Sequence, residues 1–464
     1  MGFDSIFFLA CFLPVCLAVY WLIPSHRWQN TVLLILGLVF YAFGSLSGVV
    51  ILVAFSLVNY ALGRLMGIIS QPKAVLILGI GGDLLFLLVY KYLDSLLQQV
   101  LGLPGGSLTA PIGISFYVFK SISYLVDLYR SPGNGAKGFP AYLLYLSFFP
   151  QVVSGPISRY GTFAPQLQRR SRDLGAVAHG CRRFLLGLSK KVLLSNAAAA
   201  AVDSVFALEA SALDFRLGWL GAAAYCLQIY FDFSGYSDMA IGLAAMLGFS
   251  APENFNAPYL AASIGDFWRR WHMSLSLWFR DYVYIPLGGN RKGKWRTAAN
   301  KIAVFLLCGF WHGAGWTYLL WGAWHGLFSA LESLGVIRPK AMARSRPGRV
   351  LSHIYTLAVV SIGFVMFRAA SVGEGLKVLA AMFTGFSLSL EGTVALHEIL
   401  SGRTICLLIA GVLACIPVRK WLPEKRADGK LVQTASYCLC LVLYALCLAA
   451  LASGDFAPFI YAQF

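Results

Sequence analysis

Residues 5–23 of the chain read SIFFLACFLPVCLAVYWLI, an apolar stretch without a charged side chain. A helix needs about 20 apolar residues to cross the ~30 Å hydrocarbon core of a bilayer, and this stretch is close to that length. Similar apolar windows recur along the chain, although several are short or broken; they are residues 31–43, 49–62, 74–90, 217–231, 302–311, 318–334, 354–367, 405–418 and 434–451. The pattern predicts an all-α polytopic membrane protein.

The composition excludes the main alternatives. The 464 residues are 58% hydrophobic with a mean hydropathy of +0.70, and 12% are charged, about half the usual share for a soluble globular protein. Aromatic residues make up 14% of the chain, which is too much burial capacity for a disordered protein.

The chain is nevertheless basic, with 37 Lys and Arg against 20 Asp and Glu and a formal net charge of +17. Such a surplus can indicate nucleic-acid binding, which needs cations gathered on a soluble face. Here the cations lie in loops between the apolar windows, in three clusters: Arg291, Lys292, Lys294 and Arg296; Arg338, Lys340, Arg344, Arg346 and Arg349; Arg419, Lys420, Lys425, Arg426 and Lys430. The positive-inside rule makes these loops cytoplasmic, so the surplus predicts topology and no nucleic-acid partner.

The same rule orients both ends of the chain. His26 and Arg27 place the first loop in the cytoplasm, and the last apolar window then carries residues 454–464 to the extracytoplasmic side. No positively charged segment precedes the first window, so we do not expect a cleaved signal peptide.

Two segments do not fit simple crossings. Residues 139–157 are apolar and lie between Arg130 and Arg159, and prolines and glycine break them at 149–151 and 154–156. Because both flanks are cytoplasmic, a re-entrant hairpin is predicted here, buried in protein or lining a wet cavity. A second pair of crossings should turn around residues 309–315.

Three histidines stand out in the polar region 225–324 and at its edge. His272 lies within residues 266–274, a segment too polar to span, which predicts an interfacial or re-entrant helix there; His312 and His325 lie in the apolar windows or next to them. If a helix enters the bilayer near Thr297, His312 lies ~22 Å along it, past the middle of the hydrocarbon core. A histidine at that depth is either a hydrogen-bonded structural residue or a general base.

Other site chemistries are poorly supported. His312 and His325 are 13 positions apart with no acid between them, which does not match a metal-binding helix motif. No nucleophile-elbow sequence is present. The buried carboxylates Asp232 and Asp238 are expected to hold the broken helices together by pairing with an arginine (Arg269, Arg270 or Arg280). The basic residues near the cytoplasmic mouth could serve an anionic lipid or an anionic substrate.

A set of ordered motifs resembles the membrane-bound O-acyltransferase superfamily. More narrowly, it resembles the alginate O-acetyltransferase branch, with relatives in peptidoglycan O-acetylation and teichoic-acid D-alanylation. The motifs are PQ at 150–151, SGPI at 154–157, QIYFDFSGYSD at 228–238, NFNAPY at 254–259, FWRRWHMSLS at 267–276, RDY at 280–282, IPLGGNR at 285–291, WHG at 311–313 and WGAWHG at 321–326.

The resemblance implies one membrane domain over residues 1–464, with a motif-dense core at about 110–335 and an aromatic tail at 454–464. Its expected architecture is a ring of tilted and re-entrant helices around a transmembrane tunnel. The family's catalytic histidine maps to His312 and its second functional position to His272. Residues expected on the substrate and donor side are Trp311, Arg269, Arg270, Asp232, Asp238, Ser234, Trp324 and His325. The expected donor is cytoplasmic acetyl-CoA, with no metal.

The tail, residues 459–464 (FIYAQF), resembles an aromatic C-terminal motif of this branch, in which a tyrosine is a candidate acyl carrier. The hypothesis is that His312 deprotonates Tyr461, which then passes the acetyl group outward in the bacterial cytoplasmic membrane. A polysaccharide acceptor and an extracytoplasmic SGNH-type acetyltransferase partner are expected. The alternative for the tail is an apolar anchor.

Three other functions remain open at this level. They are D-alanyl transfer from a carrier protein to teichoic acid, acylation of a lipid, and non-enzymatic transport of acyl groups. A transporter is disfavoured because broken helices occur here without an internal repeat.

Overall fold

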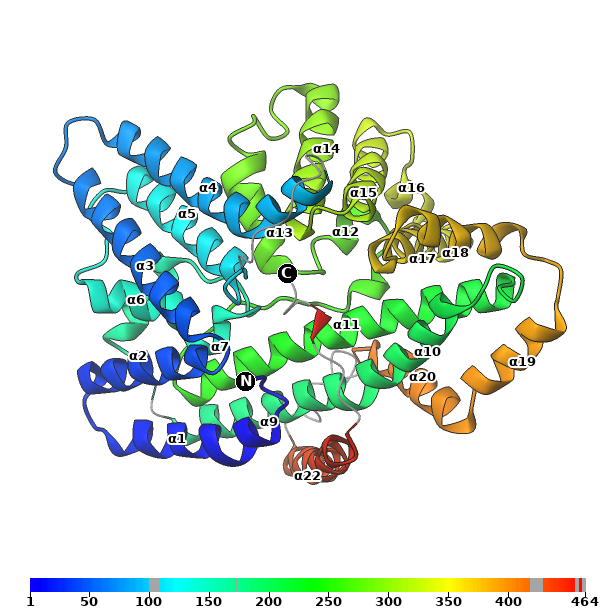
Figure 1. The fold of residues 1–464 in the computed structure, drawn as a ribbon, viewed down its shortest axis with the longest axis horizontal. Coiled ribbons are helices and arrows are strands. Elements are labelled where there is room, and N and C mark those ends of the chain that lie inside the picture. The colour runs from blue at the N-terminus through cyan, green and yellow to red at the C-terminus, as the bar shows by residue number, and fades with distance from the viewer. Residues whose placement is uncertain (100–108, 172, 418–428, 455–458, 461–464) are drawn as a thin grey trace. The chain divides into compact units, whose positions relative to one another are not determined.

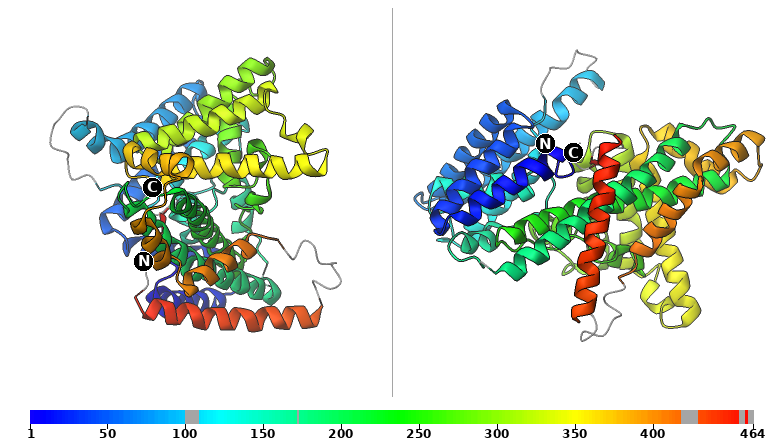
Figure 2. Two further views of the ribbon diagram at one scale, coloured as in Figure 1. Left: turned by 90° about the vertical axis from the view of Figure 1, so that its right-hand side faces the viewer. Right: turned by 90° about the horizontal axis from the view of Figure 1, so that it is seen from below.

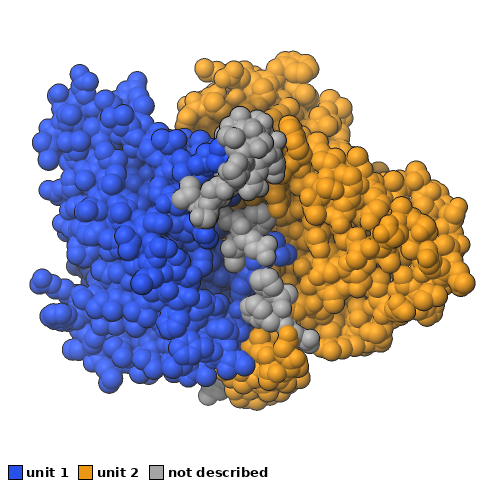
Figure 3. Space-filling view, viewed as in Figure 1, with its two compact units in different colours: residues 1–188, 236–253, 459–464 blue, residues 189–235, 254–458 orange. Residues whose placement is uncertain are grey.

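The computed structural model describes residues 1–99, 109–171, 173–417, 429–454 and 459–460, and within these ranges all regular structure is helical (Figure 1). The chain forms two compact units that alternate along the sequence (Figure 3). Unit 1 comprises residues 1–188, 236–253 and 459–464, and unit 2 comprises residues 189–235 and 254–458. The division into two units does not test the prediction of one membrane domain over the whole chain, which stays a prediction.

The N-terminal part of unit 1 is a series of apolar helices. They are the π-helix η1 (Phe8–Phe12), α1 (Leu13–Leu22), α2 (His26–Ala42), α3 (Leu46–Met66), α4 (Pro72–Gln99) and α5 (Ile114–Arg130). Short helices follow, namely α6 (Phe139–Ser147), α7 (Phe149–Val152), α8 (Tyr160–Phe163) and η2 (Ala164–Leu167), and then α9 (Leu174–Ser189). α6 and α7 are both too short to span a bilayer, as the predicted hairpin at 139–157 requires.

Unit 2 begins with η3 (Lys190–Ser195) and α10 (Asn196–Ala207), followed by the first part of α11 (Phe215–Met246). Short elements carry the polar motifs: η4 (Pro258–Leu260), α12 (Ile264–Phe267), α13 (Met273–Phe279) and η5 (Arg280–Tyr284). The remaining helices are α14 (Gly293–His312), α15 (Trp316–Leu334), α16 (Pro339–Met342), α17 (Arg346–Arg368), α18 (Val372–Thr384), α19 (Leu390–Ile399), α20 (Gly402–Ala414) and α22 (Lys430–Ala452).

Five helical stretches of the described chain have the length and apolar composition to cross a membrane, at residues 46–66, 72–93, 174–207, 346–368 and 431–452. α19 and α20, which meet at a bend of 70°, would provide a sixth if they form one broken span. The two views in Figure 2 show these long helices from other sides. The prediction of an all-helical polytopic membrane protein is confirmed; the ring around a tunnel stays a prediction.

Every predicted apolar window falls on a helix, but the helical stretch at 174–207 lies outside the predicted windows. Arg182, Arg183, Lys190 and Lys191 interrupt its hydropathy. Two of these cations are paired inside their own unit: Arg183 lies 2.9 Å from Asp238 in unit 1, and Lys191 lies 2.6 Å from Asp232 in unit 2. Pairing lowers the cost of a charge within an apolar helix, so these basic residues do not exclude a span here.

α14 and α15 pack closely because glycines line their contact. A Cβ atom placed on Gly309 would lie 2.4 Å from the carbonyl oxygen of Tyr318, and one on Gly322 would lie 2.4 Å from that of Phe305. The turn between the two helices covers residues 313–315, within the predicted range of 309–315. α14 begins among basic residues at Gly293 and ends at His312, directly before this turn.

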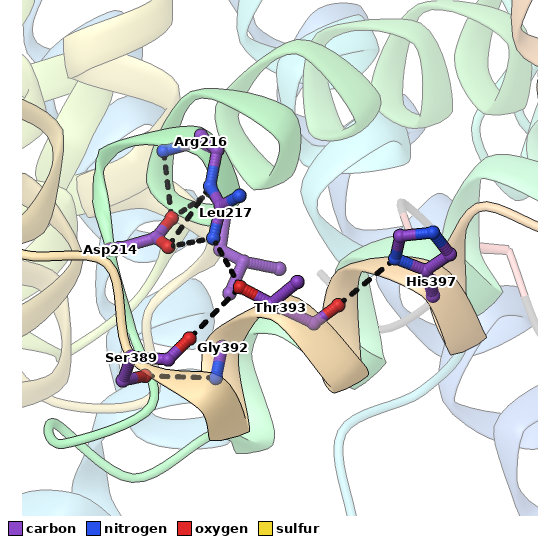
Figure 4. A network of polar contacts seen from close by, with 7 residues as sticks. All are labelled: Asp214, Arg216, Leu217, Ser389, Gly392, Thr393 and His397. Carbon is purple, nitrogen blue, oxygen red and sulfur yellow. Dashed lines mark hydrogen bonds and ion pairs between the residues drawn. The ribbon is translucent and has the colours of Figure 1, made fainter.

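A polar cluster fixes α19 to the start of α11 within unit 2 (Figure 4). The Asp214 carboxylate accepts hydrogen bonds from the backbone N–H groups of Arg216 and Leu217, which caps α11, and it lies 2.6 Å from the Arg216 guanidinium. Arg216 also donates to the hydroxyl of Thr393 on α19. Burial alone would raise the pKa of Asp214, but the bonds from Arg216 and Leu217 outweigh it and lower this pKa below its ordinary value. The carboxylate of Asp214 is therefore ionised at neutral pH, as its ion pair with Arg216 requires.

Candidate active site

His312 is the last residue of α14 and is buried, with 3% of its surface exposed. Aromatic rings enclose its imidazole: Trp321 and Phe367 meet it edge to face at 5.2 and 4.9 Å between ring centroids, and Trp311 lies at 4.6 Å. Gly313 follows directly, and a Cβ atom there would lie 2.8 Å from the Tyr318 ring. The glycines flanking His312 thus allow close packing of protein around an imidazole that bulk water does not reach.

His272 is the second buried histidine, and its backbone is unusual. It adopts the left-handed conformation, with φ of +43° and ψ of +54°, directly before α13. Few non-glycine residues adopt this conformation, which is commonest at functional sites and tight turns. The predicted single helix through residues 266–274 is wrong: α12 ends at Phe267 and α13 begins at Met273, because the conformation of His272 breaks the helix.

Asn254 holds this turn in place. Its side-chain oxygen accepts hydrogen bonds from the backbone N–H and the hydroxyl of Ser274, at 3.1 and 2.8 Å, and lies 3.3 Å from Nδ1 of His272. The backbone oxygen of Asn254 accepts from the N–H of Met273. Burial lowers the pKa of His272, which lies between two helices too short to span, to about 3, so its imidazole is neutral at physiological pH.

A cavity of about 260 Å³ opens beside His272 within unit 2. Its lining combines His272 with three cations, Arg269, Arg280 and Lys301, and with apolar side chains that include Phe279. The lining contains no Asp or Glu, although Asp266 and Asp281, which lie outside it, form ion pairs with Arg269 and Arg280. A site with these features is suited to an anionic ligand that has an apolar part.

One face of α14 continues from this cavity to His312. Lys301, Val304, Phe305 and Cys308 all line the cavity, and their spacing of three and four residues places them on a single helix face. His312, four residues after Cys308, lies on the same face. The rise from Lys301 to His312 is ~16 Å, so a single helix connects a cavity lined by three basic side chains to a buried imidazole.

Several predicted site residues have structural contacts. Asp232 and Asp238 do not pair with Arg269, Arg270 or Arg280 as predicted, because local acids occupy those arginines. Asp266 pairs with Arg269 and Arg270, three and four residues ahead of it, while Asp281 pairs with the adjacent Arg280. Asp232 and Asp238 pair instead with Lys191 and Arg183, respectively.

His325 and Trp324 lie on α15 and do not line the cavity. His325 is fully buried between the rings of Trp268 and Trp321, and neither ring nitrogen has a hydrogen-bond partner among the described residues. Trp324 donates its indole N–H to the backbone oxygen of Val359 on α17. This hydrogen bond between α15 and α17 favours a packing role for Trp324.

Ser234 and Tyr461 are the remaining predicted site residues. Ser234 is buried in α11. Tyr461 lies outside the described residues, although Phe459 at the start of the same motif packs edge to face on Tyr236 within unit 1. In the described ranges, no three His, Cys, Asp or Glu residues form a group that could hold a metal ion.

Sequence reasoning missed Asn254 and Lys191. Asn254 belongs to the motif at 254–259, but a separation of 18 residues from His272 does not predict a contact between the two side chains. Lys191 stood out only as a cation within an apolar stretch, a signal that could have been matched to the carboxylate of Asp232. In the folded chain Nζ of Lys191 and Oδ1 of Asp232 are 2.6 Å apart, and both side chains are buried.

Comparison with known proteins agrees with this geometry. Residues 106–362 match the family model described as MBOAT, membrane-bound O-acyltransferase family. The chain is 37% identical to a probable alginate O-acetylase of Pseudomonas putida, with both chains covered in full. It is 42% identical to a probable alginate O-acetylase of Pseudomonas aeruginosa over 83% of this chain and 75% of that one. It is also 33% identical to a peptidoglycan O-acetyltransferase of Helicobacter pylori over 82% and 79% of the two chains.

Motifs, helical membrane architecture and full-length similarity agree: this chain is an enzyme that belongs to the membrane-bound O-acyltransferase family.

Proposed function

We propose that this enzyme transfers an acetyl group from cytoplasmic acetyl-CoA to the extracytoplasmic side of the bacterial cytoplasmic membrane, for O-acetylation of a cell-envelope or secreted polysaccharide. The named activities of the relatives, on alginate and on peptidoglycan, support the class of acceptor. The distribution of Lys and Arg supports the direction of transfer, because it assigns the loop cations to the cytoplasm.

The observation that carries the proposal is the continuous face of α14. Arg269, Arg280 and Lys301 line the cavity, and the N–H groups that ion pairs leave over would donate hydrogen bonds to the phosphates of coenzyme A. The apolar stretch that continues through Cys308 would lead the thioester arm toward His312. The donor therefore meets a charged entrance first and a water-poor reaction centre last, which limits hydrolysis of the thioester.

In the reaction, a neutral His312 accepts the proton of an attacking hydroxyl group. The hydroxyl oxygen bonds to the acyl carbon, the carbon–sulfur bond breaks, and the imidazolium returns the proton to the leaving thiolate. The products are an acetyl ester and free coenzyme A, so atoms and charge balance without a metal or a redox step. His272, which lines the cavity, would orient the thioester.

The first acceptor in this scheme is the phenol of Tyr461. The last helix, α22, would bring the tail to the outer face, where an acetyl-tyrosine is accessible to a second enzyme. An SGNH-type acetyltransferase would take the acetyl group from Tyr461 to a polysaccharide hydroxyl and regenerate the phenol. The other role considered for the tail, that of an apolar anchor, predicts no adduct on Tyr461.

The test uses the purified full-length protein incubated with acetyl-CoA labelled in the acetyl group, followed by peptide mass spectrometry. We expect an acetyl adduct on Tyr461 in the wild type and in Tyr444→Phe, and no adduct in Tyr461→Phe. Acetyl transfer that persists in Tyr461→Phe would remove Tyr461 from the scheme. Labelling by a D-alanyl carrier protein, with none from acetyl-CoA, would replace acetyl transfer with D-alanyl transfer.

A second experiment tests His312. Loss of a general base typically slows a reaction 10²- to 10⁴-fold, so His312→Gln should abolish polymer acetylation in cells while leaving the protein in the membrane. His397→Gln, which changes an exposed histidine of α19, is the matched control. Wild-type transfer by His312→Gln would refute the general-base assignment. Because His312 is buried, size-exclusion profiles of both variants must match the wild type.

A further inference from the structure

Unit 1 contains a second and larger cavity, of about 1110 Å³, which shares no residue with the one beside His272. Its walls come from the start of α2, the end of α5, the loop after α5, and the segment from Arg159 through η2. None of the motif residues expected in catalysis lines it. The acyl-transfer reaction therefore gives no account of this cavity.

The cavity is strongly cationic. Arg27, Arg130, Lys137 and Arg159 line it together with His26, and Asp127 is the single carboxylate among the lining residues. Arg27 and Lys137 are exposed and make no side-chain ion pair with any residue that the structure describes. α2 begins at His26, so the positive end of its helix dipole lies at the same wall.

Side chains beside the cavity are of the kinds found at a membrane surface. Trp28 follows Arg27 and is 65% exposed, and Tyr129 precedes Arg130 and is also exposed. Tryptophan and tyrosine are enriched at the headgroup level of a bilayer, and loop cations mark the cytoplasmic side. Further along α2, Ile35 and Val39 are exposed apolar side chains, as expected where a helix faces lipid.

We infer that this cavity binds the phosphate-bearing headgroup of an anionic phospholipid from the cytoplasmic leaflet. Arg27, Lys137 and Arg159 would contact the phosphate, while the acyl chains lie along the apolar surface of α2. Basic pockets between transmembrane helices on the cytoplasmic side have this use in other membrane proteins. The hydroxyl group of Tyr160 in the lining would bind a headgroup hydroxyl.

Native mass spectrometry of the full-length protein in detergent tests this site, with dioleoyl phosphatidylglycerol and dioleoyl phosphatidylcholine added in turn. We expect retention of the anionic lipid by the wild type. Each cation near a lipid surface contributes roughly 1 kcal/mol, so the double variant Arg27→Gln/Lys137→Gln should bind it at least tenfold more weakly. The control Lys294→Gln/Arg296→Gln removes two equally exposed cations of unit 2 and should bind as the wild type does.

A second variant separates a filled cavity from general attraction to charge. A Cβ atom on Gly161, which lines the cavity, would have no heavy atom within 4 Å, so Gly161→Trp introduces bulk and leaves every charge in place. Binding should fall in this variant and persist in Gly402→Trp, which changes a similarly unobstructed glycine of α20. Undiminished lipid binding by Gly161→Trp would overturn the site.

Soluble competitors identify the source of the phosphate. Glycerol 1-phosphate, inorganic phosphate and coenzyme A should each fail to displace the lipid at equal concentration, because none of them has acyl chains to contact α2. Displacement by coenzyme A alone would reassign the cavity to the donor, and displacement by any small phosphate would reassign it to a soluble anion. Equal retention of phosphatidylcholine would refute headgroup selection.

Discussion

At the scale of single residues, the turn at His272 has an unusual backbone, because His272 is one of two left-handed non-glycine residues in the described chain. A left-handed, non-glycine residue costs on the order of 1 kcal/mol or more and persists only when its surroundings hold it. Here the holding group is Asn254, whose side-chain oxygen receives both hydrogen bonds from Ser274 and faces Nδ1 of His272. Asn254 is therefore a positioning residue for a histidine that lines the cavity.

We predict that Asn254→Ala lowers turnover of acetyl-CoA about tenfold or more. A buried hydrogen-bond group left without its partner costs about 1–3 kcal/mol, and the orientation of His272 would no longer be fixed. Asn254→Asp keeps the accepting oxygens and should recover part of the rate. The measurement is the steady-state rate at saturating donor, with the exposed Asn256→Ala as control. Wild-type turnover in Asn254→Ala would show that the turn is held without this side chain.

At the scale of helices, two features of unit 2 position the site. The buried pair of Lys191 and Asp232 joins η3 to α11. Removal of one member of such a pair leaves an uncompensated charge and is strongly destabilising. The glycines of α14 and α15 are the second feature, because they bring backbone against backbone and so set the height of His312. Small residues have this function at many interfaces between membrane helices.

We predict that Gly322→Ala destabilises the protein and slows acyl transfer together. The added Cβ atom would lie 2.4 Å from the Phe305 carbonyl oxygen, which is backbone and cannot rotate away, so α14 must shift and carry His312 with it. Overpacking of this kind costs roughly 1–3 kcal/mol. Thermal unfolding in detergent and acetyl transfer measure the two effects. Gly81→Ala, with no atom within 4 Å of its Cβ, should change neither.

At the scale of the whole molecule, the proposed function requires a topology that separates the donor from the acceptor. The positive-inside rule predicts that the loops with the basic clusters at 291–296 and 338–349 are cytoplasmic, and α17 to α22 would then carry the chain to the outer side. This orientation is the part of the proposed relay that depends on charge alone, and it can be measured separately from catalysis.

We predict that alkaline phosphatase fused after Phe464 is active and that the same reporter fused after Arg344 is inactive. This reporter needs disulfide bonds, which form only in the oxidising extracytoplasmic space. Green fluorescent protein fusions at the same two positions should give the opposite pattern, which controls for expression. Phosphatase activity at Arg344 with fluorescence at Phe464 would invert the topology and contradict outward transfer.

The sequence by itself determined the helical membrane class, most of the apolar helices and the turn after His312, because hydropathy, charge position and glycine are local properties of the chain. It also identified the family through its ordered motifs. Only the tertiary structure decided which charges meet. Asp266 takes the arginines three and four residues away, whereas Asp232 and Asp238 find Lys191 and Arg183, which lie 41 and 55 positions away. Contacts at such separations depend on which helix faces pack together, and no local pattern encodes that choice.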